Sequence, residues 1–198
     1  METLIRSVNT RMYGAAMSER LTKDDWIAHG LRTLASGGTG ALKVGAMADA
    51  LSVSRGSFYW HFTDIGDFKR RLLERWQELA TEQVIRELEE DGGESDRLRR
   101  LMHRALREKN ELDRAVRIWA ADEEEAAAFV AAVDDRRISF IAHLLAASGV
   151  DRDAASGRAK FIYWAYLGRS LVAGAHDRID ASTVDAISAL FENRSASR

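Results

Sequence analysis

The chain has 198 residues, of which 46% are hydrophobic and 30% are charged, and its formal net charge is −2 at pH 7. It contains no cysteine, which excludes a disulfide framework, a thiolate metal site and a thiol nucleophile. The longest unbroken apolar run, residues 126–133, is too short to cross a bilayer, and residues 1–20 lack the apolar stretch of a secretory signal, so we expect a cytoplasmic protein without a membrane partner.

The chain also contains no proline, and alanine, arginine and leucine are its most abundant residues. Because these residues are strong helix formers and no proline removes a helical hydrogen-bond donor, the composition predicts an all-α fold. The charge is unevenly distributed: residues 1–75 carry a formal charge of +3 and residues 76–198 carry −5. A mildly basic N-terminal part suits a polyanionic partner.

Residues 1–20 show no sustained hydrophobic periodicity, and we expect them to form a flexible N-terminal arm. Thr22 and Asp25 have the spacing of a capping box, which predicts a first helix that Gly37 and Gly38 end.

Two short helices are predicted next, one from about Val44 to Leu51 and one from Ser54 to about Trp60. Two helices of this length joined by three or four residues form a helix-turn-helix. Asp64 is then placed to begin a long fourth helix that connects the N-terminal and C-terminal parts of the chain.

The remaining residues predict further helices, about nine in all, separated by glycines, an asparagine and acidic or hydroxyl capping residues. We expect helix boundaries at Glu90, Ser95, Asn110, residues 122–125, Ser148, Asp151, Gly174, and Ser182 or Thr183. The predicted organisation is an arm over residues 1–20, a helix-turn-helix domain over residues 21–63 and a larger C-terminal helical domain over residues 64–198.

The helix-turn-helix segment, residues 43–62, combines apolar residues suited to a small core with polar residues suited to DNA. The expected core residues are Met47, Ala48, Leu51, Val53, Phe58 and Phe62. The candidate DNA-binding residues are Lys43, Ser54, Arg55, Ser57, Tyr59, Trp60 and His61. Arg55 can read a guanine edge in a major groove, while the hydroxyl and imidazole groups can donate to phosphates. The alternatives are a solvated charge at Arg55 and a packed core position for the aromatic residues, above all Trp60.

This segment resembles the recognition helix of the tetracycline-repressor (TetR) family in the run Val53-Ser54-Arg55-Gly56-Ser57-Phe58-Tyr59-Trp60-His61-Phe62, which Ala48 and Leu51 precede. The resemblance covers about residues 20–80. It implies an all-helical homodimer whose first three helices bind a palindromic operator in double-stranded DNA. It also implies a C-terminal domain that holds a small-molecule pocket and the dimer interface, and a function as a ligand-responsive regulator, most simply a repressor.

The sequence departs from the family pattern in three places. Lys43 stands where threonine or serine usually caps the second helix, Gly45 stands where arginine is common, and residues 63–67 lack the lysine that commonly begins the fourth helix. Residues 43–65 have a formal charge of zero, so we expect modest affinity for non-specific DNA. Further phosphate contacts can come from the basic residues of the arm and of the first helix: Arg6, Arg11, Arg20 and Lys23.

The predicted helix over residues 159–174 is apolar almost all round, and such a helix needs burial on two sides. One side can meet its own domain and the other, with small Ala165 and Gly168, can meet a second copy of the chain. The candidate dimer-interface residues are Phe161, Ala165, Gly168, Val172 and Ile187. The alternative is a monomer in which this helix is wholly internal.

Aromatic residues on facing helices can line a ligand pocket, but they are also ordinary core residues. The candidates are Trp76, His103, Trp119, Phe140 and Tyr166. This set suits an apolar or aromatic effector. Arg137 lies within an apolar stripe, where it could anchor an anionic ligand, form an ion pair with a buried acid, or pack its stem in the stripe and keep its charge in water.

No enzyme motif is present, and none of the histidines has a histidine partner three or four residues away. We therefore expect no catalytic residues, no cofactor and no metal. The alternative to a DNA-binding regulator is a helical, dimeric protein-binding module that uses residues 43–62 for a protein partner.

Overall fold

The computed structural model consists of helices joined by short turns throughout the residues that it describes, which confirms the predicted all-α fold. The described residues are 21–90, 93, 96–107, 111–172 and 179–192. The predicted arm, residues 1–20, lies outside them.

Residues 21–63 fold into α2 (Lys23–Gly37), the 3₁₀ turn η1 (Thr39–Ala41), α3 (Val44–Ala50) and α4 (Arg55–Tyr59). The predicted capping box begins α2, since the Thr22 hydroxyl accepts from the Asp25 amide and the Asp25 carboxylate accepts from the Thr22 amide. The helix ends at Gly38, whose φ is +65°. The turn between α3 and α4 places Ser52 at φ +56°, a left-handed conformation that serine seldom adopts, so this turn is tight without a glycine.

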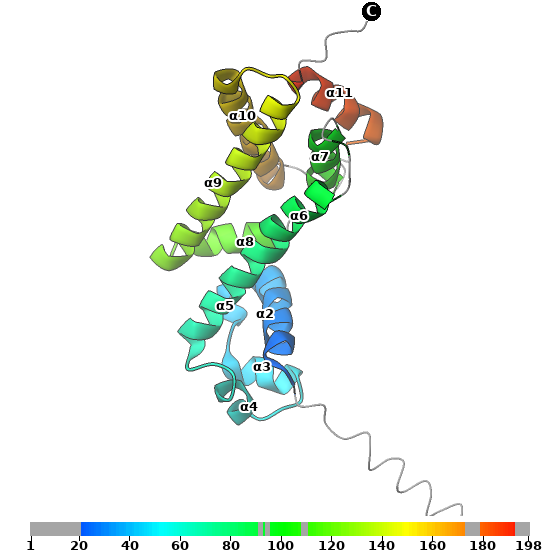
Figure 1. Ribbon diagram of the computed structural model, residues 1–198. Helices are drawn as coiled ribbons and strands as arrows, with labels where there is room; N and C mark the ends of the chain where they lie inside the picture. The colour runs from blue at the N-terminus through cyan, green and yellow to red at the C-terminus, as the bar shows by residue number, and fades with distance from the viewer. Residues whose placement is uncertain (1–20, 91–92, 94–95, 108–110, 173–178, 193–198) are drawn as a thin grey trace, which may run out of the picture.

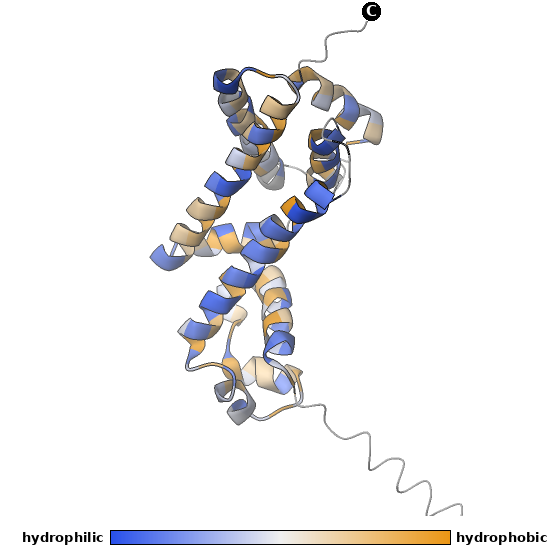
Figure 2. Cartoon of the chain, viewed as in Figure 1, coloured by the Kyte–Doolittle hydropathy of each residue, from blue (hydrophilic) through white to orange (hydrophobic). Residues whose placement is uncertain are grey.

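A long helix follows in three parts: α5 (Ile65–Gln77), the π-helical turn η2 (Glu78–Glu82) and α6 (Gln83–Glu90). Asp64 caps it as predicted, accepting from the Asp67 amide at 2.8 Å. The π turn differs from the predicted uninterrupted α-helix, because it holds one residue more than an α-helical turn. Figure 2 shows hydrophilic and hydrophobic residues alternating along α5 and α6, as in an amphipathic helix.

The C-terminal part contains α7 (Arg97–Arg107), α8 (Glu111–Ala120), α9 (Glu124–Ala147), α10 (Arg152–Val172) and α11 (Ala181–Phe191). Their bounds agree closely with the predicted helices. The predicted cap of the last helix, Ser182 or Thr183, is wrong. Asp180 is the N-cap and accepts from the Thr183 amide at 2.7 Å, as expected of a carboxylate, which is among the strongest caps.

Two apolar cores hold these helices together. The first joins α2, α3 and α4 to α5, α8 and α9, and it contains Trp26, Phe58, Phe68, Trp76 and Trp119. The second lies among α6, α7, α9, α10 and α11. Figure 1 shows α2, α3 and α4 at one end of the molecule, α10 and α11 at the other, and the long helix running between them. Because α2 also packs on α8, the first core continues across the expected domain boundary.

The crossing of α2 and α5 depends on Gly30, which is buried. A Cβ at this position would lie 2.5 Å from Cζ of Phe68 and 2.9 Å from Cδ2 of Leu72, both fully buried. We expect Gly30→Ala to lower the free energy of unfolding by about 1–3 kcal/mol, because the overlap with an immobile core outweighs the better helix propensity of alanine. Urea denaturation measures this. Gly40→Ala is the control, since a Cβ there meets nothing within 4 Å, and an equal loss in both variants would contradict the close crossing.

Candidate DNA-binding surface and ligand cavity

Two phenylalanines fix the short helix α4 in the first core, one within the helix and one just after its end. Phe58 and Phe62 are 0% and 2% exposed, and their ring centroids lie 5.0 Å apart. Met47 and Ala48 are also buried, as predicted, while Leu51 and Val53 are half-buried against the same core. The local apolar spacing therefore predicts this small core correctly.

The opposite face of the segment carries most of the candidate DNA-binding residues. Tyr59 is 59% exposed and Trp60 is 80% exposed, so neither is a packed core residue. Lys43 and Ser54 are also exposed, and the Ser54 hydroxyl makes no capping hydrogen bond although Ser54 occupies the N-cap position of α4. Ser57 is half-buried. The structure thus places an aromatic, hydroxyl-bearing surface on the outside of α4.

Arg55 is exposed, and its guanidinium lies against α3. A Cβ on Gly45 would come within 2.8 Å of Nη2 of Arg55. The glycine therefore makes room for the arginine, which gives a local structural reason for a glycine at this position.

His61 is the candidate whose position differs most from the expectation of a phosphate contact. It is half-buried, and its Nε2 lies 2.8 Å from the carbonyl oxygen of Leu21. This hydrogen bond, in the tautomer that carries a proton on Nε2, joins the end of α4 to the beginning of α2. Only the other ring nitrogen is left for a phosphate.

A cavity of about 210 Å³ lies among the long helix, α7, α9 and α10. Three of the five predicted ligand-binding residues line it: Trp76, Phe140 and Tyr166. The other two do not. Nε2 of His103 lies 2.6 Å from Asp185 and joins α7 to α11. Trp119 is buried in the first core.

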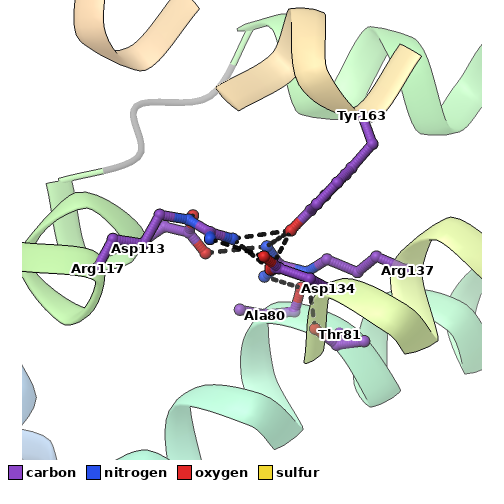
Figure 3. Close-up of polar contacts among 7 residues, drawn as sticks. All are labelled: Ala80, Thr81, Asp113, Arg117, Asp134, Arg137 and Tyr163. Atoms are coloured by element: carbon purple, nitrogen blue, oxygen red, sulfur yellow. Dashed lines mark hydrogen bonds and ion pairs between the residues drawn. The ribbon is translucent and has the colours of Figure 1, made fainter. Parts of the chain in front are cut away.

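Arg137 lines this cavity and forms hydrogen bonds with the π turn (Figure 3). Its Nε donates to the Thr81 hydroxyl at 2.9 Å, and its Nη2 donates to the Ala80 carbonyl at 3.1 Å. Nη1 forms an ion pair with Asp113 at 3.0 Å. Of the interpretations of Arg137 from the sequence, the ion pair with a buried acid is the one that the structure contains.

The same network extends to α8 and α10 (Figure 3). Arg117 pairs with Asp113 at 3.0 Å and with Asp134 at 2.7 Å. Tyr163 donates its hydroxyl to Asp134 at 2.7 Å. Burial raises the pKa of Tyr163 above its ordinary value, so the hydroxyl stays protonated and the network contains two positive and two negative charges.

Burial is the largest single influence on the pKa of Arg137 and lowers it, but Asp113, Tyr163 and Tyr166 together outweigh burial, and the pKa of Arg137 is raised. The other residues of this network were not among the candidate site residues: Thr81, Asp113, Arg117, Asp134 and Tyr163. The sequence does contain a signal for one of these contacts. Asp113 and Arg117 are four residues apart on an amphipathic helix, which is the spacing of an ion pair within a helix.

The candidate dimer surface is partly exposed in the single chain. Phe161 is 58% exposed, and its neighbour Trp164 is 63% exposed. Ala165 is exposed, and a Cβ on Gly168 would meet nothing within 4 Å.

The remaining candidate dimer-interface residues are Ile187 and Val172. Ile187 is half-buried against the second core of its own chain. Leu190 on the same helix, which was not a candidate, is 78% exposed. The side chain of Val172 lies outside the described residues.

Comparisons with known proteins do not identify the chain: no protein-family model matches it, and no curated protein matches it. Within the described residues, no helix has the length and apolar character needed to span a membrane. The same residues contain no cluster of three or more histidine, aspartate or glutamate side chains suited to a metal ion.

Proposed function

We propose that the protein is a ligand-responsive, homodimeric transcriptional regulator of the cytoplasm, a repressor that binds a palindromic operator through residues 43–62. The observation that carries this proposal is the two-sided character of α4. Phe58 and Phe62 anchor the helix in the core, while Arg55, Tyr59 and Trp60 are exposed. This is the arrangement that a helix needs in order to present side chains to a major groove.

The exposed side chains have the chemistry of a DNA contact. Arg55 offers a planar guanidinium for a guanine edge, and the hydroxyls of Ser54 and Tyr59 can donate to phosphates. The resemblance of residues 53–62 to the TetR recognition helix supports the same interpretation. A dimer would present two such helices to half-sites about 34–36 Å apart, or a multiple of that distance.

The packing supports coupling between the cavity and the DNA-binding helices. Trp76 lies in the first core and also lines the cavity. An effector that enters the cavity contacts the long helix, whose first part packs on α2. Binding shifts the DNA-binding equilibrium only if the effector prefers one of the two arrangements of that helix.

Arg55→Ala tests the direct reading of bases. We expect the affinity for the operator to fall by about 1–3 kcal/mol while the affinity for random DNA changes little, because the lost contacts are to a base. Tyr59→Phe should weaken both kinds of DNA alike, because it removes a phosphate donor. Gel-shift titrations with the region upstream of the protein's own gene, in constant salt, measure both. Equal losses on operator and random DNA for Arg55→Ala would refute its base-reading role.

A protein-binding module is the second candidate, favoured by the 80% exposure of Trp60 and by the zero formal charge of residues 43–65. The same titrations separate the two functions. A protein-binding module binds no DNA at low salt, whereas a regulator binds its operator and retains weak affinity for random DNA.

A further inference from the structure

The cavity is large enough for a small organic molecule and is mainly apolar. Its volume of about 210 Å³ exceeds the ~150 Å³ that accommodates a benzene ring in an engineered protein cavity. Aliphatic and aromatic side chains form most of the wall, among them Leu79, Val84, Leu98, Leu101, Phe140 and Ile162. A bicyclic aromatic skeleton suits this size and this lining.

The charges at the wall are already balanced. Arg137 and Asp113 line the cavity and pair with each other, and Arg104, which also lines it, pairs with Glu87. With the network partners included, three basic and three acidic side chains neutralise one another: Arg104, Arg117 and Arg137, with Glu87, Asp113 and Asp134. An ionised ligand would lose its hydration here without meeting an unpaired charge of opposite sign.

One hydrogen-bond donor at the wall is nevertheless available. The guanidinium of Arg137 has five N–H groups. Nε donates to Thr81, and Nη1 donates to Asp113 and to Tyr163. One N–H of Nη2 donates to the Ala80 carbonyl, and the other has no acceptor among the described residues. A neutral oxygen on a ligand can accept this hydrogen bond without disturbing the charge balance.

We propose that the cavity binds an uncharged, mainly apolar molecule, about two fused rings in size, that carries a hydrogen-bond acceptor such as a carbonyl oxygen. The inference rests on the proposed function, because it names the chemical class of the effector. It decides against an anionic ligand at Arg137, one of the roles that the sequence left open for this residue.

Three naphthalene compounds of similar shape test the proposal on the full-length protein. 2-Acetonaphthone is a neutral ketone, 2-ethylnaphthalene is neutral but has no acceptor, and 2-naphthoate is an anion. Equilibrium dialysis without DNA gives the dissociation constant of each. We expect the ketone to bind at least about tenfold more tightly than the anion, and several-fold more tightly than the hydrocarbon. Equal or tighter binding of 2-naphthoate, or no binding of the ketone, would overturn the proposal.

Two phenylalanine variants place the binding in the cavity. Ala105→Phe fills the cavity from α7, and we expect it to abolish binding of the ketone while the circular dichroism spectrum stays helical. Ala132→Phe on the exposed side of α9 is the matched control, and binding should be unchanged. Binding that survives Ala105→Phe would contradict the assignment to this cavity. Because dialysis needs no operator, a protein that binds the ketone but no DNA would overturn the proposed function alone.

Discussion

Replacing Arg137 with methionine should lower the free energy of unfolding by about 3–5 kcal/mol, because it breaks a buried ion pair by removing one partner. The Arg137 side chain is 12% exposed and that of Asp113 is 8% exposed, so water cannot replace the lost contacts. The Ala80 carbonyl and the Thr81 hydroxyl lose their donor at the same time. Urea denaturation followed by circular dichroism measures the change.

The adjacent Arg136 provides a matched control for this prediction. Its side chain is 47% exposed and pairs with Glu82 at 3.4 Å, at the surface. Arg136→Met should change the stability by about 0.5 kcal/mol or less, since exposed ion pairs contribute little. Similar losses in the two variants would mean that the buried network does not stabilise the fold.

The second large effect concerns the proposed dimer. Gly168→Arg should convert the protein from a dimer to a monomer and weaken operator binding by about 100-fold or more, because the two DNA-binding helices would no longer be held together. The fold of the single chain should survive, since nothing lies within 4 Å of a Cβ at this position. Sedimentation velocity distinguishes a species of 22.1 kDa from one of twice that mass.

Ala132→Arg adds the same charge at an exposed position of α9, a helix that carries none of the candidate interface residues. It should leave the sedimentation coefficient and the operator affinity unchanged. A Gly168→Arg protein that sediments as a dimer would rule out the proposed interface, and a wild-type protein that sediments as a monomer would rule out the homodimer.

The features that the sequence predicts correctly are those decided by neighbouring residues. The capping box of Thr22 and Asp25 and the cap at Asp64 each satisfy backbone amides three residues away. The burial of Phe58 and Phe62 follows from their four-residue spacing. In each case the sequence near the residue contains the physical cause.

The contacts that the sequence does not predict depend on how helices far apart in the chain are rotated and placed relative to one another. His103 and Phe140 are both candidate ligand residues by type, yet only Phe140 lines the cavity, because α7 turns His103 towards Asp185. The ion pair between Asp113 and Arg137 joins residues 24 positions apart on different helices. No local pattern specifies which of several buried acids such an arginine will meet.

The π turn also has a consequence for the register of the long helix. In an uninterrupted α-helix, Ile85 would lie about 180° round the axis from Trp76, on the opposite side. One extra residue taken up by the turn brings that difference to about 80°, and it brings Leu88 almost into line with Trp76. All three side chains are buried. The backbone has therefore absorbed the equivalent of a single-residue insertion. In this way one continuous helix keeps its apolar face in contact with both cores.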